Sequence, residues 1–564
     1  MRVSGFPDYY GFNDRKLTSK RRHWRKSLHQ ILESPAMPIG VTPENISRWS
    51  RVSLTLKRQL VAAGFGVALF AAAGSVTWPE GQDQAFFGEG GDVILDGGVP
   101  YKDFWEIKGP LADYTYALAR YLFGRHASAI RIFDLLVVAI SCLLLRKIVL
   151  QLNRGESPGA NAAVVFFLVT YYGLGYWMTA QPDGYAGFII LAAVALLLSP
   201  PWKTHWTMTA VGVLSGSAVL FKPTFLAFIL LPSLCPTANV DTARARVSLA
   251  MFYVAVTVLT IAIELFLIFH ASDGFVDLWD TLRFLSTSYA SVARLSPGDQ
   301  IWELLSKPFA MGFFGPLLLS PLILRTLLRL GMNYELRVIG LWICLSLLVV
   351  IIQGRYYEYH WLPLMISVSP IFGLAVSWSS QRWPSIASSK SVSNSLILLL
   401  IAISLFHSEV RAITQSYTWP AFATGSLSHK DYTRQVFGGG WYADSQDIAS
   451  YIDSHSNETD KVLMWGTDST VHALAKRQSP TRYEVSYPIV IPGPLASKYK
   501  RIFLEDVARD PPRYVIIDCR DPWFMTNKTG YEHLADFPAF ESFLAHYYYH
   551  LETFGGYELW EIRK

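Results

Sequence analysis

The sequence has few charged residues and few cysteines. Lys, Arg, Asp and Glu make up only 16% of its 564 residues, whereas about a quarter is usual in a soluble globular domain. Hydrophobic residues reach 51%, and the mean hydropathy is +0.26, so the shortage of charge indicates a membrane protein. Three of the 4 cysteines, Cys142, Cys235 and Cys344, lie in apolar runs. No framework of internal disulfides is therefore expected.

A cleavable secretion signal is not expected either, because the first apolar run begins roughly sixty residues into the chain. Residues 1–58 are polar and basic, and RKLTSKRRHWRK is their densest run. Such a run can bind nucleic acid. Beside a membrane it more often contacts anionic lipid head groups on the cytoplasmic face. We therefore expect residues 1–58 to be a cytoplasmic segment, with no nucleic-acid partner.

Eleven apolar runs follow, each long enough to cross a bilayer as a helix of about 17 to 25 residues. A helix satisfies its backbone hydrogen bonds internally, as lipid requires. The runs centre on Ala68, Leu136, Leu168, Leu191, Gly212, Ile229, Val258, Leu318, Leu345, Ile366 and Leu400. The runs around Ile229 and Leu400 are short, and Pro232 interrupts the first of them. The sequence predicts a polytopic α-helical membrane domain over residues 59–408.

The basic residues of the short loops predict the orientation, because such loops carry more Lys and Arg on the cytoplasmic side. They fall in alternate loops, on the same side as the N-terminus. They are Arg146, Lys147, Arg154, Lys203, Arg244, Arg246, Arg325, Arg329, Arg337, Arg382 and Lys390. The first loop, residues 78–131, and the region from about residue 409 are then extracytoplasmic.

Residues 409–564 read as a soluble α/β domain at the C-terminal end. Helix-like segments at 443–455, 498–510 and 536–548 alternate with strand-like segments at 461–466, 513–518 and 557–562. Alternation of helical and strand periods is typical of a compact α/β sheet.

The first loop is too polar to lie in lipid and too rich in aromatic residues and glycine to be a solvated tether. It is also far longer than most connections between helices. Its charged residues are Glu80, Asp83, Glu89, Asp92, Asp96, Asp103, Glu106, Asp113, Lys102 and Lys108. We expect the rest of the chain to hold this loop against a membrane.

Charged residues from distant parts of the sequence are predicted to meet at the extracytoplasmic boundary. They are Asp83, Lys108, Asp183, Lys222, Arg355, Glu358 and His360. Because an unpaired buried charge is costly, their shared depth indicates a polar cavity. Alternatively, each is an interfacial charge at a helix end, and for Lys222 alone this simpler interpretation is favoured because lysine snorkels readily. Asp183, in TAQPDGYAG, has no cation beside it in the sequence.

A carboxylate and several cations at a bilayer surface suit one class of reaction. A phosphate leaving group needs fixed positive charge, which Lys or Arg supplies. A hydroxyl acceptor needs a carboxylate as general base. Both needs meet at the bilayer surface if the donor sugar is attached to a lipid phosphate, and no nucleotide-sugar is then required.

The run DQAFFGEGGDVILDGGVPYKDFWEIKGPLADYTYALARYLFG resembles the first outer loop of bacterial GT-C glycosyltransferases. It is most similar to the aminoarabinose-transferase, protein O-mannosyltransferase and rhizobial galacturonosyltransferase-like group. The group's pattern includes GGxPYxDxxExKxP, LFG and a later arginine, here Arg131. QPDGYAG resembles the group's second outer-loop acid, and WGTDSTVHALAKRQSPTRY its soluble domain. The resemblance implies a GT-C membrane fold of about eleven helices with a C-terminal α/β domain.

The resemblance also implies roles for individual residues. Asp83 occupies the position of the catalytic acid, Lys108 that of a lysine on the donor's lipid phosphate, and Asp183 that of the second acid. The motif acids Asp103 and Glu106 are assigned to substrate binding. The group uses polyprenyl-phosphate sugars and, in its nearest branch, no metal or other cofactor for chemistry. The chain departs from the pattern in reading EIKGP where many members have EKP or KPP.

Four further residues complete the predicted site. Glu80 precedes Asp83 by one turn and competes with it as the base. Lys222, Arg355 and His360 are candidate phosphate ligands from the predicted topology. For Arg355 and His360, in RYYEYHW, an aromatic belt at the bilayer surface explains the tyrosines of the run but not its charges.

We therefore expect an integral membrane glycosyltransferase, multi-pass in a bacterial inner or plasma membrane. It would move a sugar from a polyprenyl-phosphate carrier to a lipid, glycan or protein acceptor of the cell envelope, with lipopolysaccharide modification as one case. The alternative is a transporter or flippase of lipid-linked sugars, although the two halves show no convincing internal repeat. A non-catalytic membrane scaffold is a third possibility, and it leaves the first loop unexplained.

Overall fold

The computed structural model describes residues 59–564 apart from 60, 154, 156, 235–241, 293–294, 382–390, 438–440, 521–522 and 524–525. The expectations for residues 1–58 lie outside the described residues.

A bundle of apolar helices forms the larger part of the structure. Its helices are Val61–Ser75, α5 (Ala127–Leu152), α6 (Ser157–Gly173), α7 (Pro182–Leu198), α8 (Thr204–Phe221), α10 (Ala243–Phe269), α14 (Phe314–Arg329), α15 (Asn333–Gln353), α16 (Leu362–Gln381) and α17 (Ser391–Ser416). Ten of the eleven predicted centres fall in these helices. Ile229 instead ends a 3₁₀ segment, Pro223–Ile229, which continues into the short α9 (Leu230–Leu234).

The predicted number of eleven spans is not confirmed. Among the described residues, four helices are long and apolar enough to cross a bilayer: α5, α10, α15 and the stretch Glu358–Ser377. A fifth is reached if α13 (Pro297–Ala310) and α14, bent by 96°, count as one span. Fewer helices qualify as spans because several are short. Helix α7, for example, has only 17 residues. At about 1.5 Å per residue such a helix falls short of a hydrocarbon core of about 30 Å.

Helices α6 and α16 pack at close range because small residues face each other. A Cβ atom on Gly159 would collide with the backbone of Gly373, and one on Gly373 would collide with Gly159. Further along the pair, the rings of Phe166 and Phe372 stack with centroids 4.3 Å apart. Close approach at glycine is a usual way to pack helices in lipid, where burial of apolar surface supplies little driving force.

The surface of the bundle is apolar where a membrane would meet it. Helix α10 is the clearest case, since Val247, Met251, Leu259 and Phe266 are all exposed. An exposed apolar surface of this extent would be a liability in water. It suits contact with lipid.

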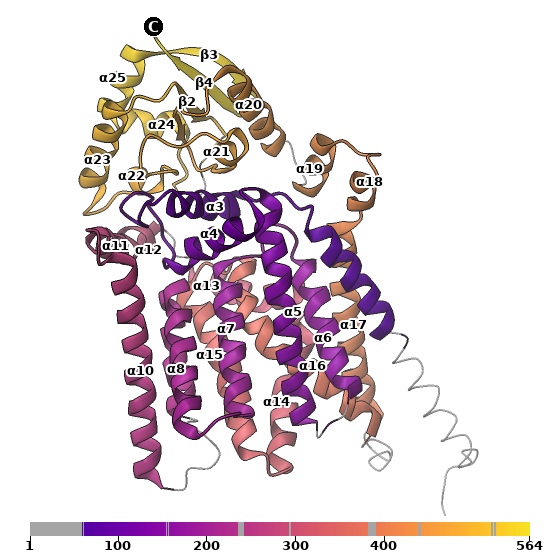
Figure 1. The fold of residues 1–564 in the computed structure, drawn as a ribbon. Coiled ribbons are helices and arrows are strands. Elements are labelled where there is room, and N and C mark those ends of the chain that lie inside the picture. The colour runs from indigo at the N-terminus through magenta and orange to yellow at the C-terminus, as the bar shows by residue number, and fades with distance from the viewer. Residues whose placement is uncertain are drawn as a thin grey trace, which may run out of the picture. The chain divides into compact units, whose positions relative to one another are not determined.

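The first loop is folded rather than extended. It contains α3 (Gln82–Leu95) and α4 (Leu111–Phe123), which pack together so closely that a Cβ on Gly91 would lie 2.7 Å from the backbone nitrogen of Ala117. Figure 1 shows both helices lying across one end of the bundle, beneath the soluble domain. The polar stretch between α10 and α14 is also ordered where described, as α11 (Gly274–Phe284), a π-helical turn Leu285–Tyr289, α12 (Ala290–Val292) and α13.

The C-terminal region contains the predicted α/β fold. Its four strands, β1 (Val462–Trp465), β2 (Tyr514–Asp518), β3 (Tyr548–Phe554) and β4 (Tyr557–Ile562), lie in the order β1-β2-β4-β3. Strands β1 and β2 are parallel, with Val462 opposite Tyr514, and the other pairs are antiparallel. The helices are α18 (Trp419–Ala423), α19 (His429–Phe437), α20 (Trp441–His455), α21 (Thr470–Ala475), α22 (Tyr487–Val490), α23 (Ala496–Arg509), α24 (Gly530–Ala535) and α25 (Pro538–Tyr547).

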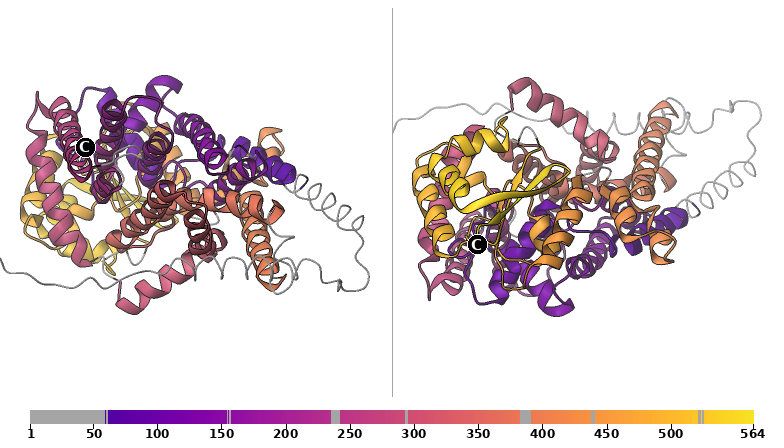
Figure 2. Two further views of the ribbon diagram at one scale, coloured as in Figure 1. Left: turned by 90° about the horizontal axis from the view of Figure 1, so that it is seen from below. Right: turned by 90° about the horizontal axis from the view of Figure 1, so that it is seen from above.

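Hydrogen bonds and ion pairs fix this domain to the end of the bundle that carries the first loop. The backbone nitrogen of Trp105, in the first loop, donates to the carbonyl of Arg482 at 2.8 Å. The Arg482 guanidinium lies 3.1 Å from Asp277 of α11, and Lys498 pairs with Asp280 of the same helix. Seen from above, the domain covers one side of the bundle and leaves the other uncovered (Figure 2).

Candidate functional site

The first loop and the turn that carries Asp183 are joined by a buried glutamine. The side-chain amide of Gln84, in α3, donates to the carbonyls of Tyr176, Trp177 and Thr179 at 3.2, 2.6 and 2.9 Å. Its carbonyl oxygen accepts from the backbone nitrogen of Gly81 at 3.1 Å. The start of α3 is therefore held in a defined position against the second loop.

Asp83 is the second residue of α3 and is partly exposed. Its Oδ2 accepts a hydrogen bond of 3.2 Å from Gln181, whose amide also donates to the carbonyl of Trp177 at 2.7 Å. Burial raises the pKa of Asp83, and the nearby Lys108 charge opposes that rise without cancelling it. The carboxyl group thus stands where it can hold or release a proton closer to neutral pH than an exposed aspartate would.

Asp183 lies in the first turn of α7 and its side chain is fully buried. Lys222, which follows α8, places its Nζ 2.9 Å from Oδ2 and 3.1 Å from Oδ1 of Asp183. Gln353, the last residue of α15, donates to Oδ1 at 3.0 Å and accepts from Lys222 at 2.5 Å. Three helix ends therefore meet in one closed polar unit.

The backbone around Lys108 is fixed by Glu106. One carboxylate oxygen of Glu106 accepts from the backbone nitrogens of Ile107 and Lys108 at 2.5 and 2.7 Å. The next residue, Gly109, packs against the end of α8, donates to the carbonyl of Phe221 at 3.0 Å, and has no room for a Cβ. The glycine of EIKGP is thus a steric requirement of this chain's own packing.

In the described structure, no donor group of another residue reaches the second carboxylate oxygen of Glu106 or either carboxylate oxygen of Asp113. Both side chains are fully buried and close to each other. Burial and the neighbouring Glu106 carboxyl raise the pKa of Asp113, and burial likewise raises that of Glu106. We interpret the two as a proton-sharing pair under the loop that carries Lys108.

The Lys108 ammonium lies over the ring of Tyr359, with Nζ 5.2 Å from the centroid, and Lys222 lies 5.7 Å from the same ring. No carboxylate oxygen of the described residues lies within 4.0 Å of Nζ of Lys108, the distance at which an ion pair forms. Burial lowers the pKa of Lys108, but the charges of Asp183 and Asp83 more than offset this and raise it overall. Lys108 is therefore a charged ammonium that forms no ion pair with a carboxylate of the described residues.

Asp83, Glu106 and Lys108 line one pocket. The first loop contributes most of the lining residues, the soluble domain contributes four, and the other three are tyrosines. The lining residues are Gln82, Asp83, Phe86, Phe87, Trp105, Glu106, Ile107, Lys108, Tyr289, Tyr357, Tyr359, Thr467, Ser469, Val485 and Tyr487. Within the described part of the chain, no three His, Cys, Asp or Glu side chains cluster as a metal site would require.

Arg355 and His360 lie beside this pocket rather than in its wall. The guanidinium of Arg355 is over the ring of Tyr289, 5.2 Å from its centroid. His360 is 4% exposed, its ring centroid is 4.6 Å from that of Tyr359, and Nδ1 has no hydrogen-bond partner in the described structure. Both are one aromatic ring away from the pocket.

Glu80 and Asp103 are engaged elsewhere. The Glu80 carboxylate is 7% exposed and pairs with Arg120 at 3.2 Å, so it lies in a different ion cluster from Asp83. Asp103 is exposed, and its carboxylate accepts from the backbone nitrogen of Val99 at 2.8 Å, closing the turn of the motif. Arg131, the later arginine of the motif, is buried and donates to the carbonyls of Pro79 and Tyr176 at 2.7 and 2.9 Å.

Sequence reasoning did not select Gln181, Gln353, Tyr359 or Tyr487. A polar side chain at the end of an apolar run was a usable signal for Gln353, and Gln181 stands two residues from Asp183. Tyr487 carried no signal, since only the folded chain brings the soluble domain to the first loop.

No protein-family model matches the sequence, and no curated protein matches it. The structure is similar to that of ArnT from Cupriavidus metallidurans bound to undecaprenyl phosphate, with a TM-score of 0.54 and 14% identity over 89% of this chain and 97% of that one. The apo state of ArnT gives a TM-score of 0.52 at the same identity and coverage. The apo oligosaccharyltransferase of Archaeoglobus fulgidus gives 0.46 at 11% identity, over 81% and 69% of the two chains. The likeness to both states of ArnT confirms the resemblance to GT-C glycosyltransferases at the level of the fold.

Proposed function

We propose that the chain is an integral membrane glycosyltransferase that moves a sugar from a polyprenyl-phosphate carrier to a hydroxyl acceptor on the extracytoplasmic face. The observation that carries the proposal is that Asp83 and Lys108 line one pocket. A base and a phosphate ligand are the two groups that such a transfer needs. The GT-C fold supports a membrane glycosyltransferase, and undecaprenyl phosphate bound to ArnT leads us to infer a carrier of that class.

Lys108 is the proposed ligand of the donor phosphate. Its ammonium has no carboxylate within ion-pair distance among the described residues, so its charge is available to an anion. Lys222 has the same sign but already contacts Asp183 and Gln353. A charged hydrogen bond to a phosphate oxygen would stabilise the negative charge that develops as the carrier leaves.

Asp83 is the proposed general base. Its carboxylate would accept the proton of the acceptor hydroxyl while that oxygen bonds to the anomeric carbon of the sugar. The bond between the anomeric carbon and the phosphate oxygen breaks in the same step, and polyprenyl phosphate leaves with the bonding electrons. A single displacement of this kind inverts the anomeric carbon.

Asp183 is proposed to act through Lys222 rather than on the substrate. Its carboxylate is fully buried, and Lys222 and Gln353 occupy its oxygens. In this position it fixes the direction of the Lys222 ammonium, whose charge acts on Asp83. It would thereby set the electrostatic potential in which Asp83 and the donor meet.

The test of this proposal uses the purified full chain in lipid nanodiscs with undecaprenyl phosphate as the probe. A lysine–phosphate contact is worth on the order of 1.5–3 kcal/mol, so Lys108→Ala should weaken binding by roughly 10- to 150-fold. Lys102→Ala is the matched control, because Lys102 lies in the same loop but does not line the pocket. Equal affinities in both variants would contradict the assignment and direct attention to Lys222 or Arg355.

A second experiment separates transfer from transport. A strain lacking the protein should accumulate a polyprenyl-phosphate sugar and lose one glycan decoration of its envelope, as seen by lipid mass spectrometry. Proteoliposomes that move the lipid-linked sugar between leaflets without transferring it would support the flippase alternative instead.

A further inference from the structure

One wall of the pocket that contains Asp83 and Lys108 comes from the soluble domain. Thr467 and Ser469 stand in the turn between β1 and α21, and Tyr487 is the first residue of α22. Each carries a hydroxyl group, and Val485 is the fourth residue of this wall. None of the four is charged, whereas the wall from the first loop carries Asp83, Glu106 and Lys108.

We propose that Thr467, Ser469 and Tyr487, the hydroxyl wall, bind the hydroxyl groups of a sugar ring held in the pocket. The inference rests on the proposed function and deepens it by naming the part of the protein that selects the sugar. A hydroxyl both donates and accepts hydrogen bonds, and this suits a neutral polyhydroxylated ring. The charged groups on the facing wall then act on the phosphate and on the reacting hydroxyl.

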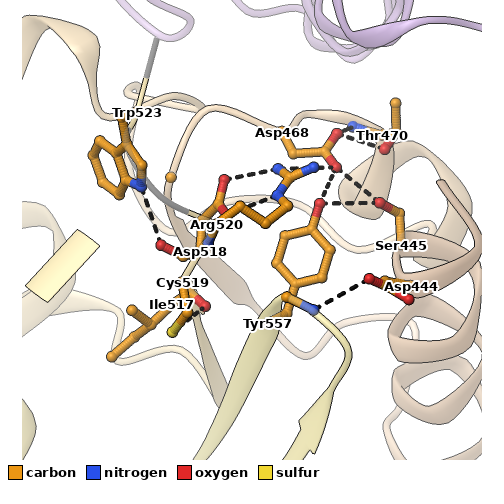
Figure 3. A network of polar contacts seen from close by, with 12 residues as sticks. Asp444, Ser445, Asp468, Thr470, Ile517, Asp518, Cys519, Arg520, Trp523 and Tyr557 are labelled. Atoms are coloured by element: carbon orange, nitrogen blue, oxygen red, sulfur yellow. Dashed lines mark hydrogen bonds and ion pairs between the residues drawn. The ribbon is translucent and has the colours of Figure 1, made fainter. Parts of the chain in front are cut away.

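The turn that carries Thr467 and Ser469 is fixed by the residue between them. Asp468 is fully buried and turns its carboxylate into the domain (Figure 3). Oδ1 accepts from the backbone nitrogen and hydroxyl of Thr470 at 2.9 and 2.5 Å. Oδ2 accepts from the hydroxyl of Ser445 at 2.8 Å and from that of Tyr557. With these four bonds the carboxylate is saturated, so it holds the turn and takes no ligand itself.

The same network reaches the ends of two strands. Arg520 places Nη2 3.7 Å from Oδ2 of Asp468 and 2.7 Å from Oδ2 of Asp518, the last residue of β2. Its guanidinium lies over the ring of Tyr557, the first residue of β4, 4.6 Å from the centroid (Figure 3). The position of the turn is therefore set by the sheet.

The two segments of the hydroxyl wall are also joined to each other. The backbone nitrogen of Ser486 donates to the carbonyl of Gly466 at 2.8 Å, and the nitrogen of Gly466 donates to the hydroxyl of Ser486 at 3.0 Å. Because the wall is organised before a ligand arrives, binding costs it little conformational entropy. This favours selection among rings that differ by one hydroxyl.

The test compares sugar-bearing and bare carriers in nanodiscs. The probes are undecaprenyl phosphate and undecaprenyl phosphates carrying glucose, galactose, galacturonic acid or 4-amino-4-deoxyarabinose. We expect Thr467→Val, Ser469→Ala and Tyr487→Phe each to weaken the best-bound sugar carrier by about 2- to 13-fold, with binding of undecaprenyl phosphate unchanged. Ser450→Ala, which removes an exposed hydroxyl of α20, is the control. Weaker binding of the bare and the sugar-bearing carriers to the same extent would overturn the proposal.

The ring belongs either to the donor or to the acceptor, and a second measurement separates them. If it is the acceptor's, the variants bind every carrier normally but transfer less sugar to the native acceptors in membranes of a deletion strain. Variants that match the wild type in both measurements overturn the proposal. The proposed function fails separately, if the wild-type protein neither binds undecaprenyl phosphate nor transfers a sugar.

Asp468 is a positioning residue in this scheme. Asp468→Asn should reduce the preference among the sugar carriers and leave the affinity for undecaprenyl phosphate unchanged. A merely structural role would lower both together and would count against the proposal. If that variant does not fold, Ser445→Ala removes one bond to the same carboxylate, and the same two outcomes apply to it.

Discussion

Lys222 and Asp183 form a buried ion pair, with Nζ of Lys222 2.9 Å from Oδ2 of Asp183. The lysine side chain is 12% exposed and the carboxylate is fully buried. In the sequence no cation stands beside Asp183, and the fold supplies one from the end of α8. The pair explains why Lys222 is less suited than Lys108 to bind a phosphate, since its charge is already compensated.

We predict that Asp183→Asn lowers stability as well as activity. Removing one partner of a buried ion pair leaves the other charge unpaired, which costs about 3–5 kcal/mol. The double variant Asp183→Asn/Lys222→Gln should recover most of that loss, because no charge is then stranded. The melting temperatures of the two purified variants measure the difference. Normal melting in both, with transfer lost in both, would instead point to direct contact between Asp183 and the substrate.

The part of the fold that the sequence predicts is the part set by local pattern. Ten of the eleven apolar centres lie in helices, and the segments predicted as strands at 461–466, 513–518 and 557–562 contain β1, β2 and β4. Strand β3 was not predicted, because its residues are mostly exposed and it follows α25 without a break. Near Ile229 the apolar run predicted a helix, but the chain forms a 3₁₀ segment there.

The residues of the candidate site also fall into two groups, those that the sequence indicates and those that only the folded chain brings together. Asp83 and Lys108 could be proposed from the sequence because one continuous loop carries them. The sequence also places Asp183 and Lys222 at one membrane boundary. It does not predict their ion pair, the contact with Gln353 or the contribution of Thr467, because only tertiary packing brings those segments together. The sequence also left Glu80 and Asp83 as rivals, and the fold separates them by pairing Glu80 with Arg120.

Helix α3 also contacts the soluble domain, where Glu89 and Glu484 line one pocket. This contact is predicted to weaken as the pH rises. Burial and the neighbouring Glu484 carboxylate raise the pKa of Glu89, and the charges of Arg120 and His472 oppose this only in part. When folding raises the pKa of a carboxyl group, the folded structure stabilises the protonated form of that group more than the ionised form. Its stabilising contribution is therefore present at low pH. It is lost as the pH climbs from the ordinary glutamate value of about 4.3 through the raised pKa.

Hydrogen–deuterium exchange of α3, corrected for the intrinsic pH dependence of exchange, measures this effect. Protection should fall between mildly acidic and mildly alkaline pH in the wild-type protein. Glu89→Gln mimics the protonated acid and should keep protection constant over the same range. Constant protection in the wild type would show that Glu89 does not control this contact.

The orientation of the chain is predicted from the basic short loops. Lys203 lies between α7 and α8, at the far end of α7 from Asp183. The soluble domain contacts the first loop, which is tied to the turn of Asp183 by Gln84. Reporter fusions at Lys203 and after Lys564 should therefore report opposite compartments, cytoplasmic and extracytoplasmic. Matching reports from the two positions would contradict the predicted topology.

Asp83→Asn is predicted to lower turnover while donor binding persists. A general base contributes about 10²- to 10⁴-fold, and asparagine keeps the shape of the side chain and its contact with Gln181. Glu80→Gln is the matched control, because it removes one acid three residues earlier. It should lower the melting temperature by weakening the pair with Arg120, with turnover nearly unchanged. Lost transfer in Glu80→Gln, with normal melting and an active Asp83→Asn, would make Glu80 the base.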